Sequence, residues 1–237
     1  DMLAAVDMIA HRRGFGDQMA LGSKRLAALI GDGAEQYLVE VKGQELPMHE
    51  PRLKAALGIG YAVSPTGGDH NHNVHDTAFT KPGRGLERVN LVYQVGPLPA
   101  NDLGVEKMTL FYHELNWKHF MDCAITCFFY PYDYTHMAQA ISGVTGHNYS
   151  IHDILAVGER AQNLCRLFNL REGFTAADDR MPARVMTAFK DGPLAGIEIT
   201  EEAFLNARQT WYRLMGWTDE GAPTPERLQH LGLTEML

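Results

Sequence analysis

Apolar residues recur at helical spacing through most of the chain, and this pattern predicts a mainly α-helical fold. One expected helix runs from Asp17, as its N-cap, to Ile30, with Leu29 among its buried residues. Gly31 is the residue that stops it. Residues 37–41 are the best candidate for a short strand, so strand is a minor part of the predicted structure.

The middle of the chain combines helical segments with a long connection. Pro51 is expected at the first position of a helix over residues 52–63, because proline suits the first helical turn. Residues 77–103 are rich in glycine and proline and are interpreted as a long irregular connection. Residues 102–129 are compatible with a helix, and a shorter helix is expected over residues 135–141.

The clearest helix signal lies in the second half of the chain. Ser150-Ile151-His152-Asp153 is a capping box, followed by an apolar stripe. Cys165 lies on that stripe, so a buried core thiol is predicted there. A last long helix is expected from Thr200 to Met215, and residues 223–231 are expected to add one or two turns.

Composition and charge narrow the possible functions. The 237 residues, 45% of them apolar, fit one large domain or two small ones. The net charge of −8 argues against a nucleic-acid partner, and no apolar run is long enough for a membrane span. Three cysteines fit a reducing, cytoplasmic compartment without a disulfide framework. The chain opens on helix-like sequence without Met or a signal peptide, which suggests a piece of a longer protein.

The segment His119–Phe128 is the first candidate for chemistry, because it places Asp122, Cys123 and Cys127 within apolar sequence. A buried carboxylate or thiolate is costly unless it has partners. On a continuous helix Asp122 and Cys127 would lie about 140° apart, so they can reach one ligand only if the helix ends between them. Cys123 and Cys127 would share a helix face. The residues alone leave two interpretations open: a thiolate metal ligand or redox pair, or two small core residues.

A polar run, Asp69–Asp76, is the second candidate. It contains His70, His72 and His75 together with two aspartates. Such a group is a credible transition-metal site, and the alternative is a hydrated loop whose Asp and Asn side chains bond the local backbone. The spacing favours the loop, because His-x-His does not fix a ligand geometry as a helical His-Glu-x-x-His does.

Several blocks of sequence together carry a resemblance to a known family. They are Gly14–Asp17, Val41–Pro47, Gly58–His70, Gly158–Arg160, Leu167–Phe174 and Asp178–Arg184. In this order, over nearly the whole chain, they resemble the carboxy-terminal portion of tungsten-containing aldehyde:ferredoxin oxidoreductases. The resemblance implies an irregular multi-helix domain of that family's carboxy-terminal type. It also implies that residues 1–42 end the middle helical domain and residues 43–237 form the carboxy-terminal helical domain, with the family's amino-terminal β domain absent from this sequence.

The resemblance also assigns roles to the two candidate segments. The family's pattern Asp-x-x-Gly-Leu-Cys supplies an Asp that binds a pterin ligand and a Cys that is the fourth ligand of a [4Fe–4S] cluster. Asp122 and Cys127 match those positions, while Ile125 and Thr126 replace Gly and Leu. Thr126 is thus placed with Asp122 and Cys127 in the cofactor-binding set, and Cys127 is the expected metal ligand. His70 matches a histidine close to the metal and is the expected catalytic residue.

The remaining candidates receive no role from the resemblance. Cys123 is not a ligand by the same match, and His72 and His75 stay loop residues. The family's other three cluster cysteines, in a Cys-x-x-Cys-x-x-x-Cys motif, do not occur in this sequence. One cysteine cannot hold a four-iron cluster. We therefore expect the chain on its own to fold without a bound cofactor and without activity.

The activity implied by the resemblance belongs to the full-length enzyme. It would oxidise aldehydes to carboxylic acids at a tungsten (or molybdenum) bis-pterin centre and pass electrons through a [4Fe–4S] cluster. The implied partners are ferredoxin, the aldehyde substrate, the remainder of the same polypeptide and, in a homodimer, a second copy. Two alternatives remain open at this point: the tungsten subunit of a benzoyl-CoA reductase, and a non-catalytic helical assembly module.

Overall fold

The computed structural model describes residues 1–236, and within them it is mainly helical, as predicted. The α-helices are α1 (Met2–Ala10), α2 (Phe15–Met19), α3 (Ser23–Ile30), α4 (Ala55–Val63), α5 (Arg84–Val89), α6 (Val105–Cys123), α7 (Tyr134–Thr145), α8 (Ile151–Arg171), α9 (Glu201–Met215) and α10 (Pro225–His230). Short 3₁₀ turns are η1 (Ala34–Tyr37), η2 (Asp76–Phe79) and η3 (Thr234–Met236). A single antiparallel pair joins β1 (Glu40–Val41) to β2 (Gln44–Glu45). No helix among these residues is long and apolar enough to cross a membrane.

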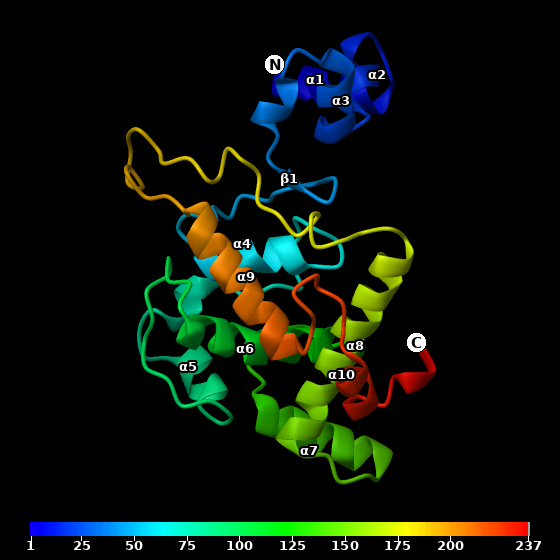
Figure 1. The fold of residues 1–237 in the computed structure, drawn as a ribbon, viewed down its shortest axis with the longest axis vertical. Helices are drawn as coiled ribbons and strands as arrows, with labels where there is room; N and C mark the ends of the chain where they lie inside the picture. The colour runs from blue at the N-terminus through cyan, green and yellow to red at the C-terminus, as the bar shows by residue number, and fades with distance from the viewer. Residues whose placement is uncertain (237) are drawn as a thin grey trace.

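The first three helices lie together at one end of the molecule, beyond the β1–β2 hairpin (Figure 1). The single helix predicted over residues 17–30 is wrong: Gly22, at φ 81°, lies between α2 and α3. The predicted buried edge is also wrong, because Leu29 is 59% exposed and α3 buries only Ala27. Helix α1 buries no residue at all. This end of the chain therefore has little core of its own.

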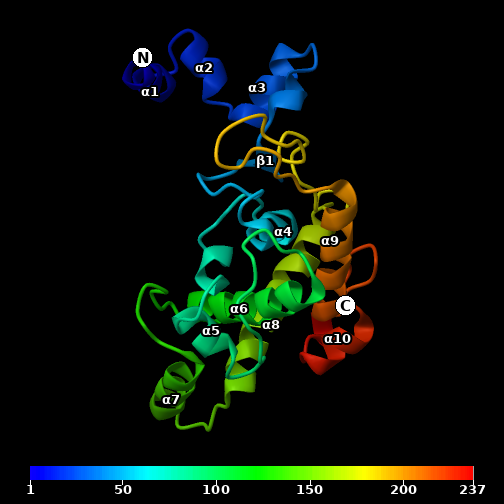
Figure 2. The same cartoon turned by 90° about the vertical axis from the view of Figure 1, so that its left-hand side faces the viewer.

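The centre of the body is the pair α6 and α8, which lie side by side (Figure 2). Gly158 of α8 permits this close approach, because a Cβ there would lie 1.9 Å from the carbonyl oxygen of Asn116 on α6. Helix α9 packs on α6 from another side and buries Trp211 and Tyr212 completely. The predicted boundaries of α9 are confirmed, with Thr200 as N-cap and Gly216 ending the helix at φ 67°.

A buried ionic network joins segments that are far apart in sequence. The Asp179 carboxylate, which is fully buried, accepts from Lys42 Nζ at 2.7 Å, from Arg166 Nη1 at 3.0 Å and from the Tyr212 hydroxyl. Lys42 Nζ also donates to the Ser64 carbonyl at 2.9 Å, just after α4 ends. Three of the blocks that carry the family resemblance, Val41–Pro47, Gly58–His70 and Asp178–Arg184, therefore meet at Lys42 and Asp179.

Several helix boundaries differ from those predicted. Helix α4 starts at Ala55 rather than near Pro51, because the Asp76 carboxylate accepts the N–H groups of Ala56 at 3.2 Å and Leu57 at 3.0 Å. The connection 77–103 is not wholly irregular, since it contains the end of η2 and the whole of α5. Cys165 is exposed rather than a core thiol, so that prediction is wrong.

Candidate functional site

Three imidazole rings and one ammonium group lie together beside the N-terminus of α4. The ring centroid of His49 lies 4.7 Å from that of His70 and 4.5 Å from that of His75. Lys54 Nζ lies 3.2 Å from His49 Nδ1 and 3.0 Å from His75 Nδ1. All four side chains are partly buried. We call these four residues the histidine cluster.

The lysine in this cluster fixes the state of two of the rings. An ammonium group only donates hydrogen bonds, so the Nδ1 atoms of His49 and His75 must both accept. Both rings are then neutral and carry their proton on Nε2. Burial, followed by the charge of Lys54, lowers the pKa of His75 to about 4 and also lowers the pKa of His49. At neutral pH the cluster therefore carries the charge of Lys54 beside uncharged His49 and His75.

Buried polar groups hold the loop that carries His70 and His75 against α4 and α6. Asp76, which is 1% exposed, pairs with Lys107 Nζ at 3.0 Å in addition to capping α4. The Asn73 amide nitrogen donates to the carbonyl oxygen of Asp69 at 2.6 Å. Gly60 of α4 makes room for Asn73, because a Cβ at Gly60 would lie 2.1 Å from the Asn73 side-chain oxygen. The loop is thereby fixed against α4 and α6.

The same loop also reaches the last turns of α6. The rings of His72 and His119 have centroids 5.5 Å apart. His72 Nδ1 lies 3.2 Å from an oxygen of Asp69, and His72 Nε2 lies 2.7 Å from the Ser64 hydroxyl. Burial raises the pKa of Asp122, and the nearby charges of Lys118 and His72 partly offset that rise. The structure thus brings the His70 loop and Asp122 to one end of α6, although they are separated in sequence.

Helix α6 ends between Asp122 and Cys127, which is the condition for both to reach one ligand. Its last residue is Cys123, and Ile125 adopts a left-handed conformation with φ 54°. The backbone N–H of Thr126 donates to the Met121 carbonyl at 3.0 Å, and the Thr126 hydroxyl donates to the same oxygen at 3.2 Å. Thr126 therefore caps the helix, and its hydroxyl is already engaged.

Residues Lys118–Tyr130, which we call the α6 end, present several unpaired groups at the surface. Asp122, Cys123 and Cys127 are all exposed. Cys123 and Cys127 no longer share a helix face, because the helix stops at Cys123. Lys118 is nearly buried at 8% exposure, and it makes no hydrogen bond or ion pair within residues 1–236. Its ammonium lies 3.1 Å from the centre of the Phe128 ring.

These groups can be compared with the needs of the cofactors that the sequence suggests. A pterin ring has both hydrogen-bond donors and acceptors, and the exposed Asp122 carboxylate with the unpaired Lys118 ammonium one turn away offers both complements. Among the described residues no group of three or more His, Cys, Asp or Glu side chains could hold a metal ion. Cys127 therefore fits the role of a single ligand, and the described part of the chain does not supply a complete set.

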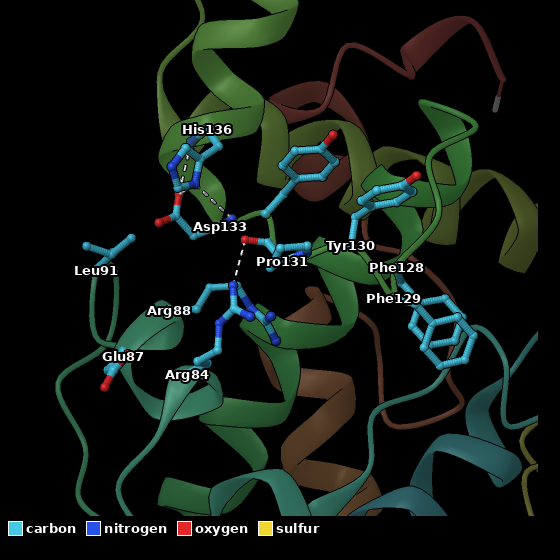
Figure 3. A pocket seen from close by; sticks show the side chains of 11 residues that line it. Arg84, Glu87, Arg88, Leu91, Phe128, Phe129, Tyr130, Pro131, Asp133 and His136 are labelled. Atoms are coloured by element: carbon cyan, nitrogen blue, oxygen red, sulfur yellow. Dashed lines mark hydrogen bonds and ion pairs between the residues drawn. The ribbon is translucent and has the colours of Figure 1, made fainter.

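A cavity of about 340 Å³ lies next to the α6 end, between α5 and the segment 128–136 (Figure 3). Figure 3 shows Arg84 and Arg88 near Pro131, with the rings of Phe128 and Phe129 together on the other side. Arg84 donates to the Pro131 carbonyl at 2.8 Å, and Arg88 donates through Nε to Glu114 at 3.1 Å. Both arginines of this cavity thus have partners already.

Sequence reasoning missed part of this arrangement. His49 and Lys54 were not candidates, because nothing in their spacing from residues 69–76 indicates that they lie beside that loop. The sequence predicts His75 to be a loop residue without a role, yet its ring belongs to the histidine cluster. Nothing in the sequence marks Lys118 as a site residue either, because a lysine in a helix is ordinarily exposed to solvent. The one available clue was the density of histidines in residues 70–75.

Comparison with known proteins identifies relatives of the whole chain. The family model described as aldehyde ferredoxin oxidoreductase, domains 2 & 3, matches residues 1–233. A tungsten-containing aldehyde ferredoxin oxidoreductase from Pyrococcus furiosus is 32% identical over 97% of this chain and 36% of that protein. One of the same description from Pyrococcus horikoshii is 34% identical over 98% of this chain and 36% of that protein. The chain thus spans about a third of the length of these relatives.

One solved structure has the same fold over nearly the whole chain. It is a chain of the active site complex BamBC of benzoyl coenzyme A reductase in complex with 1,5-dienoyl-CoA. The TM-score is 0.70 at 21% sequence identity, and the match covers 98% of this chain and 38% of that chain. At this level of identity the likeness shows a shared fold.

Proposed function

This chain belongs to the aldehyde ferredoxin oxidoreductase family, and from that premise we propose that the complete polypeptide oxidises an aldehyde to a carboxylic acid at a tungsten bis-pterin centre. The electrons would pass through a [4Fe–4S] cluster to ferredoxin. The observation that carries the proposal is the meeting of the His70 loop with the α6 end, where the helix stops between Asp122 and Cys127. A site divided between these two segments needs that meeting.

His70 is the residue that we propose for proton transfer. Oxidation of an aldehyde by water releases two protons with the two electrons, so the site needs a group that accepts a proton from the reacting oxygen or carbon. His70 is partly buried and lies against the neutral ring of His49, with the ring of His75 6.0 Å away. Lys54 bonds the rings of His49 and His75 and not that of His70, so this ammonium leaves the ring nitrogens of His70 available.

The α6 end is the part of the chain that we propose to hold the cofactors. When bound, the tungsten–pterin group supplies two-electron redox chemistry and polarises oxygen. The Asp122 carboxylate would accept hydrogen bonds from N–H donors of the pterin ring, and its exposure leaves both oxygens available. Cys127, as a thiolate, would be one ligand of the [4Fe–4S] cluster. Thr126 would contribute by holding the Asp122–Cys127 turn, because its hydroxyl already bonds Met121.

The test is His70→Ala in the complete polypeptide. Turnover of an aldehyde substrate should fall by about 10²–10⁴, the range for loss of a proton-transfer residue. Tungsten and iron content should stay near wild type, because His70 is not a ligand in the proposal. His147→Ala is the matched control, since His147 is exposed and lies away from the cluster.

Two results would overturn the proposal. An unchanged rate and pH–rate profile in His70→Ala would remove His70 from the mechanism. A wild-type polypeptide that contains no tungsten, or that acts on an aryl-CoA thioester and not on aldehydes, would contradict the reaction itself.

A further inference from the structure

Lys118 is 8% exposed and forms no ion pair with a carboxylate within residues 1–236, and this separates it from the other lysines that the fold encloses. Lys107 and Lys42, whose side chains are 1% and 2% exposed, each pair with a fully buried aspartate. Lys118 is 8% exposed, and within residues 1–236 its ammonium has neither an ion pair nor a hydrogen bond. A charge that is partly removed from water is stabilised by a hydrogen-bond acceptor, so the Lys118 ammonium is suited to bind one.

None of the carboxylates described around Lys118 forms an ion pair with it. Burial lowers the pKa of Lys118 to about 8. The carboxylates of Asp122, Glu114 and Asp69 act against this and raise the pKa, while the charge of Arg88 lowers it further. Glu114 is already bound to Arg88 and to the hydroxyl of Tyr134. Asp69 lies 3.2 Å from His72. Only Asp122, one helical turn further on, has no partner of its own among the described residues.

The contact that Lys118 does make leaves it available. Its Nζ lies 3.1 Å from the centre of the Phe128 ring, and Phe128 belongs to the turn after α6 and is itself 41% exposed. A cation–π contact offers no hydrogen-bond acceptor in the plane of the ring, so the ammonium keeps its capacity to donate. Lys118 and Asp122 are four residues apart on α6 and therefore present a donor and an acceptor on one face.

We propose that Lys118 is a second pterin-binding residue, which donates to an electron-rich oxygen of the cofactor while Asp122 accepts from its ring N–H groups. The proposal rests on the proposed function. The oxygen belongs either to the ring carbonyl or to the phosphate, and both are acceptors for an ammonium group. The cofactor then supplies the anionic or polar partner that this chain does not give to Lys118.

The experiment uses the complete polypeptide with Lys118→Met, Lys118→Arg and, as a matched control, the exposed Lys81→Met. The readouts are pterin per chain, measured by fluorescence after oxidative release, tungsten per chain by elemental analysis, and the midpoint potential of tungsten by redox titration. Lys118→Met should lower pterin and tungsten content by roughly tenfold, the loss typical of a group that supports a metal site. Lys118→Arg and Lys81→Met should stay near wild type.

Two further readouts sharpen the interpretation. Tungsten that remains in Lys118→Met should have a more negative midpoint potential, because loss of a nearby positive charge favours the oxidised metal. Lys118→Gln keeps a neutral donor, so it should retain cofactor if the partner is the ring carbonyl and lose it if the partner is the phosphate. Lys118→Gln also decides the proposal if Lys118→Met does not fold, as judged by circular dichroism.

Wild-type content and potential in a folded Lys118→Met variant would overturn the proposal and leave Lys118 with a structural role only. If Lys118→Met does not fold, wild-type content together with a wild-type midpoint potential in Lys118→Gln would overturn the proposal in the same way. A loss of cofactor in Lys81→Met as large as the loss in a folded Lys118 variant would also overturn it. A wild-type polypeptide without pterin or tungsten is a different outcome, because it contradicts the proposed function first.

Discussion

The histidine cluster and the α6 end lie in the same candidate site but differ in how their polar groups are partnered. In the cluster, Lys54 donates to two imidazoles, and the buried pair of Asp76 and Lys107 supports the loop. At the α6 end, Ile125 is 93% exposed and Phe129 is 84% exposed. The polar groups of the histidine cluster therefore have partners within this chain, whereas side chains at the α6 end are exposed.

This difference shows which parts of the candidate site are positioned by residues of this chain alone. The orientation of the histidine cluster depends on residues that all lie within the chain, so a change in their support should be measurable in the 237-residue protein. The exposed apolar side chains and thiols at the α6 end are poorly solvated by water, which is typical of an interaction surface. The α6 end has no such support among the described residues, and because the chain spans 36% of its relatives' length, that end is tested in the complete polypeptide.

The largest effect is expected when the α6 end is altered in the complete polypeptide. Cys127→Ser should abolish or strongly disturb the [4Fe–4S] signal, because a serine oxygen is a harder and poorer ligand for iron than a thiolate. Cys123→Ser is the matched control, since Cys123 is also exposed and only four residues away. It should leave the cluster intact. Electron paramagnetic resonance of the dithionite-reduced proteins measures both.

The reverse result would be informative. A normal signal in Cys127→Ser with a lost signal in Cys123→Ser would shift the match to the family pattern by four residues. The assignment of Asp122 would then be withdrawn together with that of Cys127.

The next effect concerns the support of the histidine cluster. Asp76→Ala should lower the free energy of unfolding by about 3–5 kcal/mol, because it leaves Lys107 buried without its partner. It also removes the acceptor for two N–H groups at the start of α4. Urea denaturation of the 237-residue chain measures the change. Asp191→Ala, at an exposed position, should change the stability by less than about 0.5 kcal/mol.

A double variant tests the cause of that loss. Asp76→Leu combined with Lys107→Met removes both charges, so it should be less destabilised than the sum of the two single changes. Additive losses would mean that the ion pair is not what holds the loop.

The fold was predictable where local signals are strong. The capping box at Ser150 and the N-cap at Thr200 give the starts of α8 and α9, because side-chain caps act within a few residues. The boundaries of α3 and α4 were not predictable. Gly22 breaks one helix through its backbone conformation, and the start of the other is set by Asp76, which lies about twenty residues away in sequence.

The candidate site was predictable in its parts but not in its arrangement. The density of histidines after Asp69 and the Asp122–Cys127 spacing indicated two segments of interest. Their meeting depends on the contact between His72 and His119, which arises only when the loop folds onto α6. The roles proposed for His70, Asp122, Thr126 and Cys127 remain predictions. Lys54 and Lys118 could not be predicted as site residues, because each is distinguished from other lysines only by the side chains that surround it in the fold.

The smallest effect is expected at Lys54, and it tests whether the histidine cluster depends on that charge. In Lys54→Met, the pKa of His75 should rise from about 4, because the nearest positive charge is lost. Burial, the larger cause, remains, so the pKa should stay below the ordinary value of about 6.5. Lys54→Arg keeps the charge and is the matched control. Titration of the histidine ring signals by nuclear magnetic resonance measures the shift.

The same change should alter the dependence of stability on pH. The folded pKa of His75 is lower than its unfolded value, so its contribution to stability is complete above about pH 6.5 and is lost as the pH falls towards about 4. A higher folded pKa in Lys54→Met narrows that window. The free energy of unfolding should therefore fall less steeply between pH 6.5 and pH 4 in Lys54→Met than in Lys54→Arg. Equal slopes in the two variants would show that burial alone keeps His75 neutral, and that Lys54 does not set the state of the cluster.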